Sequence, residues 1–221
     1  SMELLDFARG PALAVAFAVF ALGVAWRLSV MLLAPRLKER APPREKHASH
    51  AKYFVQGVFS RFWPHKTFER ATFTNHLMAY IFHIGLFVVV FLYRPHILFI
   101  ESLVGVSWPA LPNVVVYGVG MVTVGAMIVV IVRRWTNPVQ RLISTFNDWS
   151  SWVITLAPVL TGLALISGFF GVRYETLLAV HILSFCLLLI WIPFSKLMHT
   201  FTFIPARGMS AVRLKRRGTA F

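Results

Sequence analysis

Four of the eight histidines in this 221-residue chain lie within apolar stretches, and their spacing groups them into two pairs. His181 and His199 are 18 residues apart in the run VHILSFCLLLIWIPFSKLMHTFTFIP. In one continuous α-helix this spacing makes five whole turns and rises about 27 Å, so both imidazoles would share a face and lie near opposite surfaces of a bilayer. His76 and His83 are seven residues apart and would share a face of another helix.

Paired histidines in apolar helices indicate a ligand site. A polar imidazole in lipid is costly unless it faces the protein interior and has a partner. Haem iron takes axial histidine, and helix bundles build cofactor sites from side chains on facing helices. Antiparallel helices that carry these pairs could hold two haems, one toward each surface. We therefore interpret the four histidines as bis-histidine haem ligands, with hydrogen-bonded structural histidines as the alternative.

The composition places these histidines in a membrane protein. Hydrophobic residues make up 57% of the chain and charged residues only 14%, a balance that ordinary soluble domains do not show. The single cysteine, Cys186, excludes a disulfide within the chain, a cysteine-ligated iron–sulfur cluster and a CxxCH haem attachment. Any haem would therefore be held non-covalently. The net charge of +14 does not indicate nucleic acid, because in a membrane protein its distribution between the two sides matters instead.

Five apolar segments predict an all-α integral membrane protein, a single domain of residues 1–221 with five transmembrane helices in one bundle. The expected spans are residues 11–34, 72–93, 112–132, 149–170 and 177–199. The polar connection 35–70 lies between the first two and is predicted to contain a short helix on the membrane surface. Its His47, His50 and His65 are predicted to be solvated, because no cysteine or carboxylate stands at metal-site spacing.

Lysine and arginine set the predicted orientation. Nineteen of the 22 fall in segments that would lie on one side, namely 27–70, 133–148 and the tail after Pro193, and three fall on the other. The positive-inside rule then predicts an outer N-terminus and a cytoplasmic C-terminus, in a multi-pass protein of the cell inner (cytoplasmic) membrane. The basic inner face suits an acidic cytoplasmic partner or anionic membrane lipid, and charge alone does not separate the two.

The sequence resembles the gamma subunit of respiratory nitrate reductase. The resemblance covers the five-span layout and is carried by PFSKLMH, which ends at His199 and has His181 18 residues before that histidine, by FHIG around His83, and by LGVAWR in the first span. It implies a membrane-anchor cytochrome b subunit that transfers electrons between the quinone pool and a cytoplasmic iron–sulfur or related redox subunit of an oxidoreductase complex. Related anchors serve other redox complexes, so nitrate is not implied.

The sequence departs from the family pattern at Tyr93, where a second histidine is expected ten residues after His83. Either His76 supplies this ligand, or His96 does, or one of the two expected haem b groups is absent. His96 is 13 residues beyond His83, about 220° round the helix, and would face away unless Pro95 bends the chain.

These alternatives give two ligand sets. In the first, the inner pair is His76 with His199 and the outer pair is His83 with His181; we prefer this set for its helical phase and depth. In the second, His83 keeps its family role and pairs with His199, and the outer haem depends on His96.

The quinone site is expected near the outer face, where a few polar residues could bond a quinone oxygen or relay protons: Arg94, His96, Glu101 and Tyr117. Two other classes of function stay open. One is a haem-free membrane anchor or scaffold, and the other is a proton-coupled transporter in which paired histidines relay protons. No inverted repeat or pair of broken half-helices supports the transporter.

Overall fold

The computed structural model of the chain describes residues 2–35, 42, 44, 49–60, 62–64, 66–168 and 171–219. His47 and His65 lie outside these residues, and His50 is exposed. The described part contains helices and no strand: α1 (Met2–Phe7), η1 (Ala8–Ala12), α2 (Leu13–Leu33), α3 (His50–Ser60), α4 (Glu69–Phe91), α5 (Arg94–Val104), α6 (Asn113–Thr136), α7 (Pro138–Leu142), α8 (Phe146–Ser167), α9 (Tyr174–Trp191), η2 (Ile192–Phe194), η3 (Lys196–Met198) and α10 (His199–Arg216).

Among the described residues, five helical stretches are long and apolar enough to cross a membrane, and each overlaps one predicted span: Met2–Leu33, Glu69–Phe91, Asn113–Thr136, Phe146–Ser167 and Tyr174–Phe194. This confirms the prediction of an all-α membrane protein with five candidate spans. The first stretch begins at Met2 rather than at residue 11, because the π-helical turn η1 accommodates Pro11 without ending the helix.

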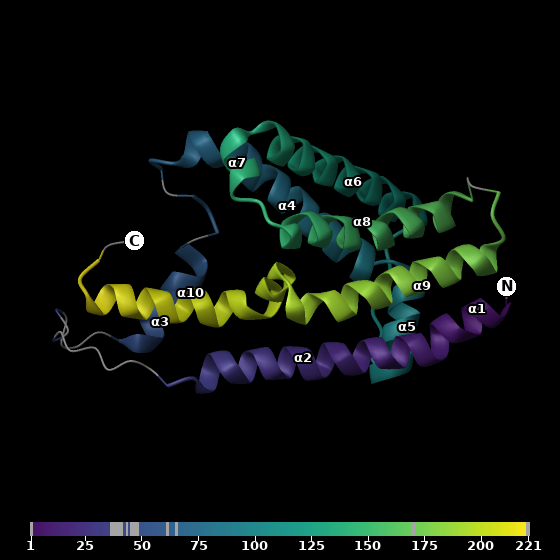
Figure 1. The fold of residues 1–221 in the computed structure, drawn as a ribbon, viewed down its shortest axis with the longest axis horizontal. Helices are drawn as coiled ribbons and strands as arrows, with labels where there is room; N and C mark the ends of the chain where they lie inside the picture. The colour runs from purple at the N-terminus through teal and green to yellow at the C-terminus, as the bar shows by residue number, and fades with distance from the viewer. Residues whose placement is uncertain are drawn as a thin grey trace.

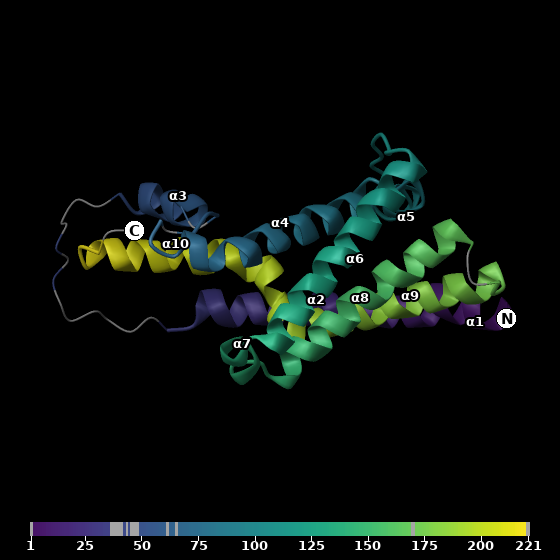
Figure 2. The ribbon, with the colours of Figure 1, turned by 90° about the horizontal axis from the view of Figure 1, so that it is seen from above.

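The long helices pack in a series in which α4 lies along α6, α6 along α8, α8 along α9, and α9 along α2. The basic helix α10 continues the direction of α9 beyond the ends of α2 and α4, and the N-terminus lies at the opposite end of the molecule (Figures 1 and 2). The helix α3, which comes from the polar connection, packs on α10. Glycines allow this close approach, because a Cβ at Gly57 would overlap Ala211 and a Cβ at Gly208 would overlap the ring of Phe54.

The contact between α4 and α6 depends on Gly85, where a Cβ would overlap the hydroxyl of Thr123. We expect Gly85→Ala to destabilise the protein by roughly 1–3 kcal/mol, because overpacking outweighs the gain in helix propensity of about 1 kcal/mol. Gly125→Ala on α6 is the matched control, since a Cβ there meets nothing within 4 Å. Thermal unfolding in detergent, followed by circular dichroism, measures both variants, and equal stability would contradict the packing described here.

The fifth span is not the continuous helix from His181 to His199 that the sequence predicted. α9 ends at Trp191, and the turns η2 and η3 precede α10. Pro193 lacks the N–H that would continue the helix, and Ser195 is extended, with φ −123° and ψ 177°. The Ser195 hydroxyl accepts a hydrogen bond from the Leu197 N–H at 3.1 Å and starts the next turn. The five-turn phase relation between the two histidines therefore does not apply.

A second break re-aims the chain after α4. The helix ends at Phe91, Tyr93 is extended with φ −90° and ψ 128°, and α5 starts anew with Pro95 in its first turn. Because His96 belongs to this new helix, counting turns from His83 gives the wrong direction for its side chain. The prediction that His96 faces away from the side of His83 applies only to an unbent helix, and the helix is broken between these residues.

Candidate functional site: two facing histidine pairs

The first histidine pair joins α4 to the start of α10. The ring centroids of His83 and His199 are 6.0 Å apart, with an angle of 78° between the ring planes. Both side chains are exposed. The break at Pro193 places His199 here, because it turns the chain before α10 begins.

The second pair joins α5 to α9. The ring centroids of His96 and His181 are also 6.0 Å apart, but these rings are nearly parallel, with an interplanar angle of 5°. Both residues are half-buried. Burial lowers the pKa of His96 below its ordinary value, which keeps this imidazole neutral at pH 7, the form that binds iron. The edge of the Tyr93 ring contacts His96, with centroids 5.2 Å apart.

The spacing in both pairs suits a shared metal ion. Two imidazoles that bind one metal from opposite sides, each through a nitrogen about 2.0–2.1 Å from it, have ring centroids roughly 6 Å apart. Two imidazoles that merely touch can adopt many centroid distances. Simple contact therefore does not explain why the same distance occurs in two separate pairs. The arrangement can therefore supply two axial pairs, one from α4 with α10 and one from α5 with α9.

Three of the four imidazoles are oriented by backbone carbonyls. The Nδ1 atom lies 2.7 Å from Ala79 O in His83, 2.8 Å from Val89 O in His96 and 2.8 Å from Lys196 O in His199. A carbonyl oxygen only accepts, so Nδ1 carries the proton and Nε2 keeps a free lone pair. Metal-binding histidines in proteins are held in this way.

The fourth imidazole is oriented by a hydroxyl on α8. His181 Nδ1 lies 3.0 Å from Thr161 Oγ1, which is also 2.8 Å from Ala157 O. The hydroxyl donates to that carbonyl and therefore accepts from Nδ1–H of His181, which again leaves Nε2 available. Gly162 keeps the approach open, because a Cβ there would lie 3.2 Å from the His181 ring.

The structure does not bring together the pairs of the preferred ligand set. His76 lies two turns before His83 on α4, with its Nδ1 3.1 Å from Thr72 O. Within the described residues, its ring contacts no other histidine ring. The two close pairs are instead those of the second set, with His96 in place of His76. Whether these residues bind iron stays a prediction.

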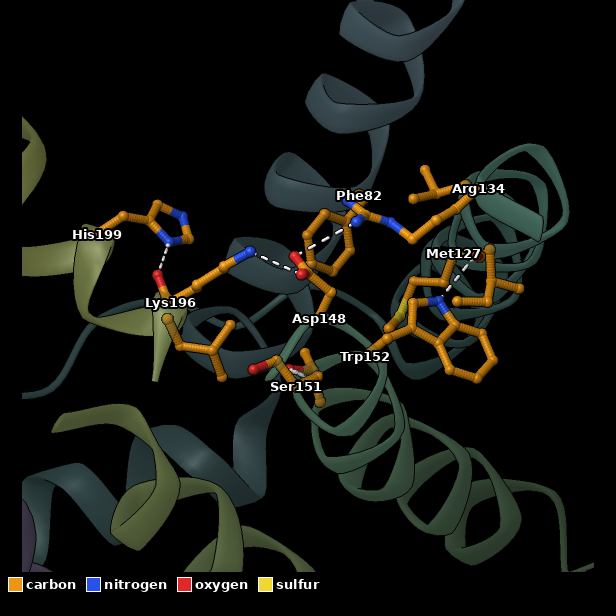
Figure 3. A pocket seen from close by; sticks show the side chains of 12 residues that line it. Phe82, Met127, Arg134, Asp148, Ser151, Trp152, Lys196 and His199 are labelled. Atoms are coloured by element: carbon orange, nitrogen blue, oxygen red, sulfur yellow. Dashed lines mark hydrogen bonds and ion pairs between the residues drawn. The ribbon is translucent and has the colours of Figure 1, made fainter. Parts of the chain in front are cut away.

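The turn that carries His199 is fixed by the start of α8. The Lys196 N–H donates to Asn147 Oδ1 at 2.8 Å, and Lys196 Nζ lies 2.6 Å from Asp148 Oδ2. Arg134 Nη1 lies 3.3 Å from the other oxygen of the same carboxylate. Figure 3 shows this cluster and the bond from His199 to Lys196 beside a cavity of about 240 Å³. Asn147 thus holds the backbone of Lys196 and Asp148 holds its side chain, and the carbonyl of Lys196 orients His199.

The residues predicted for a quinone site do not form one cluster. Arg94 and Glu101 are exposed on α5, and Tyr117 is half-buried on α6. In the described part of the chain, no hydrogen bond joins these three side chains to one another. His96 belongs to the second histidine pair instead.

Within the described ranges, no three histidine, cysteine, aspartate or glutamate side chains come together as a metal centre. A haem needs fewer ligands from the protein, because its porphyrin nitrogens fill the other iron positions and axial histidines complete the set. The two histidine pairs and their acceptors are therefore the residues available to such a group.

Comparison with known proteins identifies a similar protein but assigns no activity. No family model matches the chain. A curated protein of Nitratidesulfovibrio vulgaris strain Hildenborough is 29% identical over 206 residues, which cover 90% of this chain and 86% of that protein. Its description reads only "Protein".

Proposed function

We propose that the protein is the membrane-anchor cytochrome b subunit of a redox complex, with two non-covalent haem b groups. His83 and His199 bind the inner haem, and His96 and His181 bind the outer haem. The observation that carries the proposal is the recurrence of one spacing in two places: two imidazoles with ring centroids 6.0 Å apart and their Nδ1 protons engaged. His76, which lacks a facing histidine in the described structure, is not a ligand in this proposal.

Bound haem supplies one-electron transfer, and the protein supplies ligation and surroundings. The four histidines present Nε2 to iron, and their acceptors hold the rings at the required angle. The apolar helices keep the pathway between the two pairs at low dielectric. The helices α5 and α9, which carry His96 and His181, lie toward the end of the molecule that holds the N-terminus, whereas α10, which begins at His199, extends from the middle toward the opposite end (Figure 1).

The five spans form one bundle in the cell inner membrane, with the N-terminus outside and the C-terminus in the cytoplasm. This orientation is supported by the basic residues of α10, Arg207, Arg213, Lys215 and Arg216, which continue past the spans as the positive-inside rule requires. The outer haem would exchange electrons with quinol or quinone, and the inner haem would exchange them with a cytoplasmic iron–sulfur or related redox subunit.

The proposed activity is tested by adding a quinol analogue to the purified, oxidised protein under anaerobic conditions. We expect a reduced haem b spectrum to develop, equal in final amplitude to that produced by dithionite. A haem-loaded protein whose spectrum does not respond to quinol would contradict the quinone role and leave the ligand assignment standing. A haem-free protein would favour the scaffold or transporter.

The Thr161 hydroxyl provides a test of the outer pair. Its loss removes the hydroxyl acceptor of His181 Nδ1–H, so we expect Thr161→Val to weaken outer-haem binding roughly 10- to 100-fold. Thr155→Val is the control on the same helix, because that hydroxyl bonds to Ser151 O at 2.7 Å and has no hydrogen bond to a histidine in the described structure. Haem retention during dilution and competition with apomyoglobin measures the effect. Equal retention in both variants would show that Thr161 does not position His181.

A further inference from the structure

Arg207 on α10 has a buried nitrogen without a partner. Its Nη1 atom is inaccessible to solvent, and no acceptor lies within hydrogen-bond distance of it among the residues that the structure describes. A buried cationic donor left unpaired is costly, and native proteins rarely keep one. This buried donor therefore needs an acceptor, and an anionic oxygen would supply one.

The guanidinium lies beside the preceding turn of α10, on the side nearer the start of this helix. Its Cζ atom lies 5.9 Å from the ring centroid of Phe203, which is one helical turn from Arg207 and one turn from His199. Helical side chains lean toward the N-terminus of their helix, which is the direction of His199 here. The two turns rise about 12 Å, a distance that a carboxylate arm of a haem and an extended arginine side chain can cover together.

The other side of the guanidinium is closed by the chain segment that leads into α4. Cζ lies 5.2 Å from the ring centroid of Phe62. The carbonyl of Phe62 accepts a hydrogen bond from the hydroxyl of Tyr80, which lies one turn before His83. Arg207 thus sits between the two segments that carry the inner histidine pair.

We propose that Arg207 binds a propionate carboxylate of the haem held by His83 and His199, an assignment that rests on the proposed function. A guanidinium offers paired N–H donors that match the two oxygens of a carboxylate. A lipid phosphate offers similar chemistry. The enclosure of the guanidinium by Phe62 and Phe203, with Nη1 buried, favours a group that reaches it from the protein interior.

The test compares the inner-haem potential in the full-length parent protein, Arg207→Gln and Arg207→Lys, with Arg216→Gln as a control at the end of α10. Without the cation, the propionate charge stabilises ferric haem. We expect Arg207→Gln to raise the ratio of oxidised to reduced inner haem tenfold at a fixed potential, a shift of about 59 mV. Arg207→Lys should recover most of the shift, and Arg216→Gln should show none.

Two further arms separate a propionate from a lipid. In protein loaded with haem dimethyl ester, whose propionates carry no charge, the parent and Arg207→Gln should retain the inner haem equally, because the ion pair that the substitution removes is already absent. The potential shift with unmodified haem should also be the same in phospholipid-free detergent and in phosphatidylglycerol vesicles. A difference in retention that survives esterification, or a potential shift that appears only in those vesicles, assigns Arg207 to lipid and overturns the proposal. If Arg207→Gln binds two haems and its inner-haem potential is unchanged, the role of Arg207 is overturned and the proposed function stands. If the parent protein binds no haem, both the role of Arg207 and the proposed function are overturned.

Discussion

The His199→Ala variant is expected to contain one haem per chain where the parent contains two. His199 is the first residue of α10, its ring faces His83, and removing the imidazole leaves the inner iron with one axial ligand. The fold should survive, because the side chain is exposed and its loss removes one hydrogen bond, to Lys196 O, worth about 1 kcal/mol. Pyridine haemochrome assay against protein concentration gives the ratio.

His50→Ala serves as the control for this substitution, because His50 is an exposed histidine on α3 and faces neither pair. It should keep both haems. A His199→Ala protein that retains its full haem content would remove His199, and with it the inner pair, from the ligand set.

The second expectation separates His96 from His76. His96→Ala should lose the outer haem, because its ring lies parallel to that of His181 with the centroids 6.0 Å apart and has its Nδ1 proton engaged. His76→Ala should keep both haems, because the described structure gives it no facing histidine. The same haem assay on the two variants decides the matter. The ligand set preferred from the sequence predicts the opposite result for each variant, so one haem lost in His76→Ala and none in His96→Ala would restore it.

Composition and hydropathy were enough to predict the five candidate spans, because a membrane helix is specified by a long run of apolar residues. The histidines could also be predicted as a group, since polar residues in apolar spans are conspicuous. Which histidines pair with each other could not be predicted in this way. Helical phase predicts which residues share a face only while the helix continues, and both relevant helices end between the residues being compared.

The two breaks show where such counting fails. Pro193 ends one helix before His199, and the extended Tyr93 starts a new helix before His96. Pro193 and Pro95 are both visible in the sequence, but the direction of the chain after each depends on capping and packing. Asn147 and Asp148, for example, hold the turn before His199 from a distant segment.

The supporting residues had even weaker signals. In the sequence Thr161 is one of several small residues of its span, and its contact with His181 depends on how α8 and α9 pack. Arg207 appeared only as one cation in a basic tail. Its buried nitrogen and its place beside Phe62 follow from the packing of distant segments.

The decisive measurement is the ratio of haem to protein in the purified parent chain, expressed with ample haem and determined by pyridine haemochrome assay and amino-acid analysis. Two histidine pairs with the same ring spacing predict a ratio of two, with a reduced spectrum typical of bis-histidine haem b. A ratio of one would contradict the assignment of both pairs, and a chain without haem would contradict the proposed function itself.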